Sequence, residues 1–133
     1  MQNLQAKGTF DVKLNPESIS EVAGATGLGR LSLDKKFHGD LTAASQGEML
    51  AFRSAEAGSA GYVAMEKVSG DLHGRRGDFV LQHSSTMTRG APVQSISVVP
   101  DSGTEQLTGL AGTFIIDIVD KIHHYQFNYT LPD

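Results

Sequence analysis

Hydrophobic and polar residues alternate with a period of two along most of the chain, whereas the 3.6-residue period of a helix is almost absent. Such alternation is typical of β-strands that bury one face, because successive side chains point to opposite sides of a strand. Glycine, proline and aspartate residues separate the alternating segments and indicate turns. The pattern predicts eight strands, over residues 4–14, 30–38, 41–55, 62–72, 78–87, 93–99, 112–119 and 124–131.

The sequences of two connections between these strands predict their local structure. Asn15 can cap a helix and Pro16 suits the first helical position, so a helical turn is expected over residues 16–22. Residues 73–77, with the sequence HGRRG, are small, polar and flanked by glycine, which is typical of a hairpin connection. We therefore expect the strands at 62–72 and 78–87 to pair as a hairpin.

Long successive strands joined by short turns favour an antiparallel up-and-down arrangement. Open sheet edges invite aggregation, and closing the sheet removes them. We therefore predict an all-β fold, a closed antiparallel up-and-down barrel of about eight strands that forms a single domain over residues 1–133. The interior of such a barrel is either filled by side chains or holds one small ligand.

Composition narrows the classes of partner and location. The formal charge is −4 and no basic run exceeds two residues, so we expect no nucleic-acid partner. The chain has no cysteine, which excludes disulfides and thiolate chemistry and fits a reducing compartment, so a cytoplasmic location is expected. The first residues lack the pattern of a signal peptide and no apolar run approaches about eighteen residues, so no membrane partner is expected.

The candidate functional side chains lie on the predicted strands at 62–72 and 78–87. One face of the second strand carries Phe79, Leu81, His83, Ser85 and Met87. If Lys67 faces water, Tyr62 and Glu66 face the interior from the first strand. With a turn centred near residue 75, Glu66 and His83 are expected to lie almost directly opposite each other, although a slip of one residue would reverse the faces.

A buried pair of Glu66 and His83 has two interpretations. The carboxylate fixes the histidine tautomer and raises its pKa, which makes Glu66 and His83 candidate catalytic residues for acid–base chemistry. Alternatively, the two groups only satisfy each other's hydrogen bonds. No cofactor or metal site is expected: His123 and His124 are adjacent and point to opposite faces, and the chain has neither a phosphate loop nor a serine-hydrolase elbow.

Several segments together carry a resemblance over nearly the full length of the chain. They are residues 36–41 (KFHGDL), 45–50 (SQGEML), 61–68 (GYVAMEKV), 79–84 (FVLQHS), 87–90 (MTRG), 107–114 (LTGLAGTF), 124–125 (HY) and 129–131 (YTL). In these the chain resembles a family of small bacterial proteins catalogued only as a domain of unknown function. The resemblance implies a barrel similar to that of plant allene oxide cyclase, related in shape to lipocalin-like barrels. It brings no established reaction and no residue-level site.

Three functional hypotheses follow. The first is a barrel that binds a small apolar or amphipathic molecule in its lumen. The expected lining is Tyr62, Glu66, Phe79, Leu81, His83, Ser85, Phe127 and Tyr129. The second is an enzyme of the isomerase or cyclase type that uses Glu66 and His83 in the lumen. The third is a fully packed barrel that acts as an oligomeric structural or interaction protein, with an outer face, at residues such as Val80, Val98 or Ile116, as the interface. A homo-oligomer is expected in all three.

Overall fold

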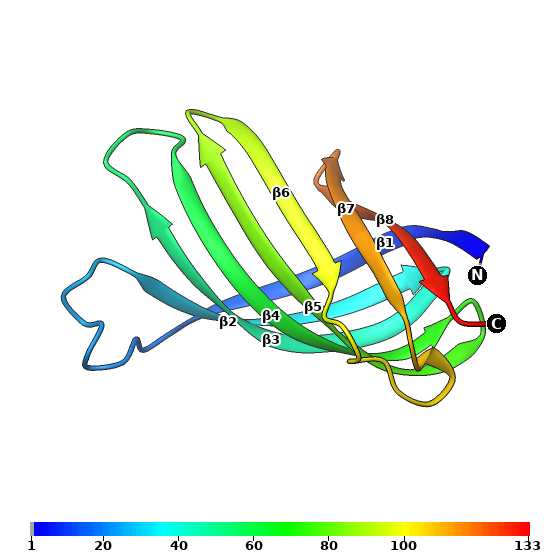
Figure 1. The fold of residues 1–133 in the computed structure, drawn as a ribbon. Helices are drawn as coiled ribbons and strands as arrows, with labels where there is room; N and C mark the ends of the chain where they lie inside the picture. The colour runs from blue at the N-terminus through cyan, green and yellow to red at the C-terminus, as the bar shows by residue number, and fades with distance from the viewer. Residues whose placement is uncertain (1) are drawn as a thin grey trace.

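The computed structural model describes residues 2–133, which form a closed antiparallel barrel of eight strands (Figure 1). The strands follow their chain order around the wall, and β1 closes the barrel by pairing with β8. Their bounds are β1 (Gln2–Glu17), β2 (Gly29–Gly39), β3 (Leu41–Arg53), β4 (Ala60–Leu72), β5 (Arg75–Thr88), β6 (Ala91–Val98), β7 (Ala111–Val119) and β8 (Ile122–Leu131). The predicted all-β, up-and-down barrel is confirmed.

The alternation of the sequence reappears as alternating burial along each strand. In β8, for example, Tyr125, Phe127, Tyr129 and Leu131 are buried, and the residues between them are only partly covered. The interior therefore receives every second side chain from each strand, as the period of two requires. The expected placement of Val98 and Ile116 on the outer face is wrong, because both belong to this inward set. Among residues 2–133, no helix is long and apolar enough to cross a membrane.

The helical turn predicted over residues 16–22 is wrong. Strand β1 continues through Glu17, and turns follow at residues 21–25. Pro16 pairs in register with Leu31 of β2, while the pairing of β1 with β8 stops at Phe10. Because this end of β1 has a neighbour on one side only, a residue without an N–H group is tolerated there.

The β4–β5 hairpin is tighter than predicted. Its turn contains only His73 and Gly74, with φ angles of 48° and 81°, as a two-residue hairpin turn of type I′ requires. Strand β5 therefore begins at Arg75, before the expected start. Gly77 lies inside the strand, where a Cβ would come within 2.2 Å of the Thr104 carbonyl oxygen.

This shorter turn changes the register. Glu66 pairs with Leu81, and His83 pairs with Ala64. The prediction that Glu66 and His83 lie almost directly opposite each other is therefore wrong, because the residue opposite Glu66 is two positions before His83. Both side chains remain on the inner face, as diagonal neighbours, and this arrangement still allows long side chains to touch.

One end of the barrel is solidly packed. Its core includes the stacked rings of Phe79 and Phe127, whose centroids are 5.8 Å apart. The short 3₁₀ helix η1 (Glu105–Leu107), which the sequence did not predict, places Leu107 under the barrel beside Leu110, and both are almost fully buried. Figure 1 shows both termini and the connection between β6 and β7 at this end. We call it the plugged end.

The wall is least complete between β6 and β7. Within residues 2–133, these strands pair only at Ile96 with Phe114 and at Ser97 with Thr113. Away from the plugged end they diverge (Figure 1). There the Gln94 side-chain carbonyl accepts a hydrogen bond of 2.9 Å from the Ile116 N–H, so a side chain takes the place of a backbone partner.

Candidate functional site

The end of the barrel opposite the plug contains a cavity of about 500 Å³. This volume lies in the range of about 300–1,000 Å³ that is usual for small-molecule sites. The walls are mainly apolar and come from most strands of the barrel. The apolar lining side chains are Phe10, Val12, Leu14, Leu33, Met49, Ala64, Met87, Pro92, Ile116 and Ile118.

Four buried polar side chains lie together inside the barrel, two of them in the lining of this cavity, and we call them the polar floor: Lys35, Ser45, Glu66 and His83. They converge on the Glu66 carboxylate. Its Oε2 lies 2.9 Å from Lys35 Nζ and 2.6 Å from His83 Nε2, and its Oε1 accepts a hydrogen bond of 2.7 Å from the Ser45 hydroxyl. The Glu66 carboxylate is thus held by three groups from three other strands.

Glu66 is ionised despite its burial. Burial by itself would raise the pKa of this carboxyl, but the hydrogen bond from His83 and the positive charge of Lys35 outweigh it and lower the pKa to about 2. An ionised carboxylate only accepts hydrogen bonds. His83 Nε2 must therefore carry the proton in its contact with Glu66, which fixes the tautomer of the neutral imidazole.

The cavity contacts only part of the polar floor. Lys35 and His83 line the cavity, whereas Glu66 lies beneath them with 1% of its surface exposed. Among residues 2–133, His83 Nδ1 has no hydrogen-bond partner. No side-chain nitrogen or oxygen atom in the same residues is both inaccessible to solvent and without a hydrogen-bond partner. The Nδ1 lone pair is therefore accessible from the cavity and can accept a proton or a hydrogen bond.

Two further polar side chains stand near His83. The Tyr62 ring lies 6.4 Å from the imidazole, centroid to centroid. Burial, together with the charge of Glu66, raises the pKa of Tyr62, so the phenol stays protonated near neutral pH. The Ser85 hydroxyl donates to the Val93 carbonyl at 3.1 Å. Both residues line the cavity.

The eight lumenal residues expected from the sequence divide into three groups. Tyr62, His83 and Ser85 line the cavity. Glu66 lies beneath it, in contact with His83. The structure places Phe79, Leu81, Phe127 and Tyr129 in the packed half of the barrel, where they do not line the cavity. Alternation indicates which side chains face inward, but it does not indicate their height along the barrel axis.

Sequence reasoning missed Lys35 and Ser45. Leu33, Lys35 and Phe37 are two residues apart in β2 and therefore share its inner face. This spacing could have indicated that Lys35 is buried. A lysine in a strand is normally assigned to the solvent face, because its charge is costly to bury without a partner. Ser45 gave no comparable signal, since the residues of β3 around it are small or polar.

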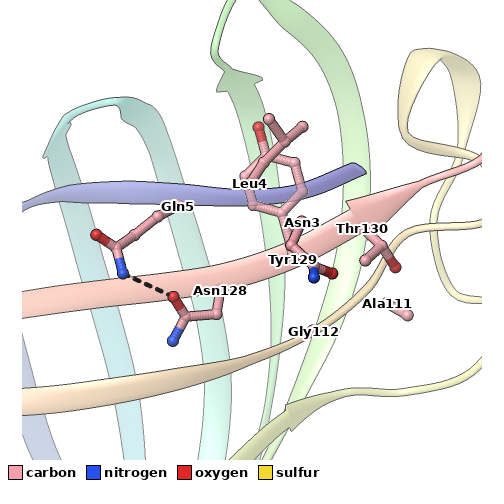
Figure 2. Close-up of a pocket in the computed structure, with 8 residues that line it drawn as sticks. All are labelled: Asn3, Leu4, Gln5, Ala111, Gly112, Asn128, Tyr129 and Thr130. Atoms are coloured by element: carbon pink, nitrogen blue, oxygen red, sulfur yellow. Dashed lines mark hydrogen bonds between the residues drawn. The ribbon is translucent and has the colours of Figure 1, made fainter. Parts of the chain in front are cut away.

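Another hollow lies apart from the polar floor. A hollow of about 470 Å³ is lined by residues of β1, β7 and β8, which Figure 2 shows, and there the Gln5 amide donates to the Asn128 side-chain oxygen at 2.9 Å. Its exposed side chains are uncharged, and it does not include the polar floor. Among residues 2–133, no three His, Cys, Asp or Glu side chains gather closely enough to hold a metal ion together.

Comparison with known proteins identifies relatives without an assigned activity. The family model described as "Protein of unknown function (DUF3224)" matches residues 6–129. A crystal structure of a protein with unknown function from this family, from Shewanella oneidensis MR-1, is 48% identical, covers 99% of each chain and has a TM-score of 0.92. No curated protein matches the chain. The likeness to allene oxide cyclase stays a prediction.

Proposed function

The chain belongs to the family described as Protein of unknown function (DUF3224), and we propose that it binds a small amphipathic molecule in the cavity at the open end of the barrel. The observation that carries this proposal is the division of the interior into a plugged half and a hollow half. A barrel whose interior served only for stability would gain from filling both halves, because unfilled apolar space forfeits packing contacts.

The polar floor supports a role in recognition. A buried cluster of charges is weak evidence for stability, since apolar side chains of similar volume often replace such clusters without loss. Here Lys35 and His83 line a cavity whose other walls are mainly apolar. A few convergent polar groups at the end of an apolar pocket are typical of a ligand-binding site. The ligand's polar end would meet these groups, and its apolar part would lie against residues such as Leu33 and Met49.

Native mass spectrometry of the purified protein tests the proposal. We expect the wild-type chain to carry a small molecule, and Ala64→Phe to lose it because the new ring occupies the cavity. Val93→Phe is the control, since Val93 of β6 is 69% exposed and does not line the cavity. Val93→Phe should retain the molecule. A wild-type protein without any bound molecule, whose cavity resonances also fail to respond to 1-decanol in NMR spectra, would contradict the proposal.

A second candidate function is acid–base catalysis in the same cavity. The specific observation in its favour is that Glu66 holds His83 Nε2–H while Nδ1 is accessible from the cavity. A carboxylate that orients an imidazole and stabilises its protonated form is a recurrent arrangement for general bases. If the barrel is an enzyme of this kind, the wild-type protein will convert its bound molecule and His83→Gln will bind it unchanged. Recovery of the same unaltered molecule from both proteins would argue against catalysis.

We also propose that the chain forms a homo-oligomer and works in the cytoplasm, as the sequence led us to expect. Apolar residues on the outer face of β3 and β4 support self-association: Leu50 pairs with Val63 across these strands, and Met65 follows on the same face. Light scattering coupled to size exclusion would show a mass above that of one chain. A single-chain mass for the wild-type protein at high concentration would contradict the oligomer.

A further inference from the structure

We propose that the cavity selects an anionic head group, of the carboxylate class, and binds it at Lys35 and His83 with the apolar chain of the ligand directed toward the mouth. The site is the cavity of the proposed function, on which this inference rests. It adds the sign of charge and the orientation of the molecule that the cavity accepts.

The charges of the polar floor lie at different depths from the cavity. The negative charge of the polar floor belongs to Glu66, which is buried beneath the cavity and engaged by Lys35, His83 and Ser45. The positive charge belongs to Lys35, which lines the cavity. A ligand entering the cavity therefore meets the ammonium group before it meets the carboxylate. This order of charges favours an anion and disfavours a cation.

Lys35 has more hydrogen-bond donors than the protein uses. An ammonium group has three donors. Among residues 2–133, Lys35 Nζ makes one hydrogen bond, to Glu66, and lies 4.9 Å from the centre of the Phe10 ring. Its side chain is almost fully buried and lines the cavity, so a partner for the remaining N–H groups has to come from within the cavity. A carboxylate oxygen in the cavity can accept from these donors, whereas an ammonium head group cannot.

His83 complements Lys35 at the same end of the cavity. In its neutral form the imidazole offers the Nδ1 lone pair, which accepts a hydrogen bond from a hydroxyl group. When protonated, it donates from Nδ1 as well, and a carboxylate would then receive donors from both side chains. The other titratable groups that line the cavity are Tyr62, Asp117 and His123. Asp117 is an exposed residue of β7, so its charge is screened by solvent and does not offset that of Lys35.

Three probes with the same chain and different head groups test the inference: decanoate, 1-decanol and decylammonium, titrated calorimetrically into the full-length protein at pH 7. We expect decanoate to bind about tenfold more tightly than 1-decanol, because charge-assisted hydrogen bonds are stronger than neutral ones. Decylammonium should bind more weakly than 1-decanol. Equal affinities for decanoate and 1-decanol would overturn the anion inference and leave the proposed function standing. Failure of all three probes to bind would overturn both.

Adjacent lysines provide the matched variants. Lys35→Met should lower the affinity for decanoate about tenfold and leave that for 1-decanol unchanged. Lys36→Met removes the same charge from the exposed face of β2 and should bind decanoate as the wild type does. If Lys35→Met fails to fold because Glu66 loses a partner, the double variant Lys35→Met/Glu66→Gln removes both charges and should show the same loss. Decanoate affinity that survives in a folded Lys35 variant would overturn the assignment of the head-group site.

Discussion

The ionised state of Glu66 makes the stability of the barrel depend on pH in a defined direction. Its pKa is lowered from 4.5 to about 2 in the folded protein. A group whose pKa is depressed by folding stabilises the folded state above its unfolded pKa, and that contribution is lost as the pH falls through the folded pKa. The relevant window therefore runs from about pH 5 down to pH 2.

The magnitude follows from the difference between the two pKa values. At 1.36 kcal/mol per pKa unit, lowering the pKa from 4.5 to about 2 corresponds to about 3 kcal/mol of the free energy of unfolding. Glu66 is almost fully buried, so solvent screens this contribution little. A loss of about 3 kcal/mol is a large fraction of the 5–15 kcal/mol that is usual for the stability of a domain.

Urea denaturation followed by far-ultraviolet circular dichroism, repeated from pH 6 to pH 2, measures this contribution. The wild-type free energy of unfolding should fall relative to that of Glu66→Gln by about 3 kcal/mol across the window, because glutamine has no carboxyl group to protonate. Glu48→Gln is the control: Glu48 is an exposed acid on the outer face of β3 whose pKa is also lowered, by its hydrogen bond from Arg30. Its curve should stay close to that of the wild type. Parallel curves for the wild type and Glu66→Gln would refute the reasoning.

Three further perturbations test other parts of the structure. Leu107→Ala should lower the free energy of unfolding by about 2–5 kcal/mol in urea titrations, because it leaves a void in the plug; a change below 1 kcal/mol would mean that the plug does not close the core. Gly77→Ala should destabilise the fold measurably in the same assay, because its Cβ would collide with the Thr104 carbonyl; unchanged stability would contradict the close approach of that loop. Gln94→Ala should speed hydrogen exchange at the Ile116 amide while leaving global stability within about 0.5–1.5 kcal/mol; unchanged exchange would show that the side chain does not protect this amide.

The sequence predicted the barrel because the relevant signal is repeated in every strand. Each strand alternates in polarity, so an error at one end, as at Pro16, does not alter the number or the order of the strands. The hairpin at His73 shows where this signal stops. Alternation is compatible with several turn lengths, and only the positive φ angles at His73 and Gly74 select the two-residue turn and hence the register.

The candidate site was harder to predict for two physical reasons. Which strands contribute at the same height depends on the stagger between strands, so Phe127 and His83 both point inward but lie in different halves of the barrel. Burial of Lys35 depends on a partner from another strand, Glu66, and no pattern within β2 reveals that partner. The contact between Glu66 and His83 was predictable because both residues lie on one hairpin, whose two strands are neighbours in sequence.

The central claim, that the open half of the barrel binds a small molecule against the polar floor, is tested most directly by a methyl NMR titration with decanoate. We expect chemical-shift changes and intermolecular nuclear Overhauser effects at Leu33, Met49 and Ile116, which line the cavity, and none at Leu107 or Leu110 in the plugged end. Shifts confined to residues of the outer hollow, or no saturable shifts at the three cavity residues, would contradict the account.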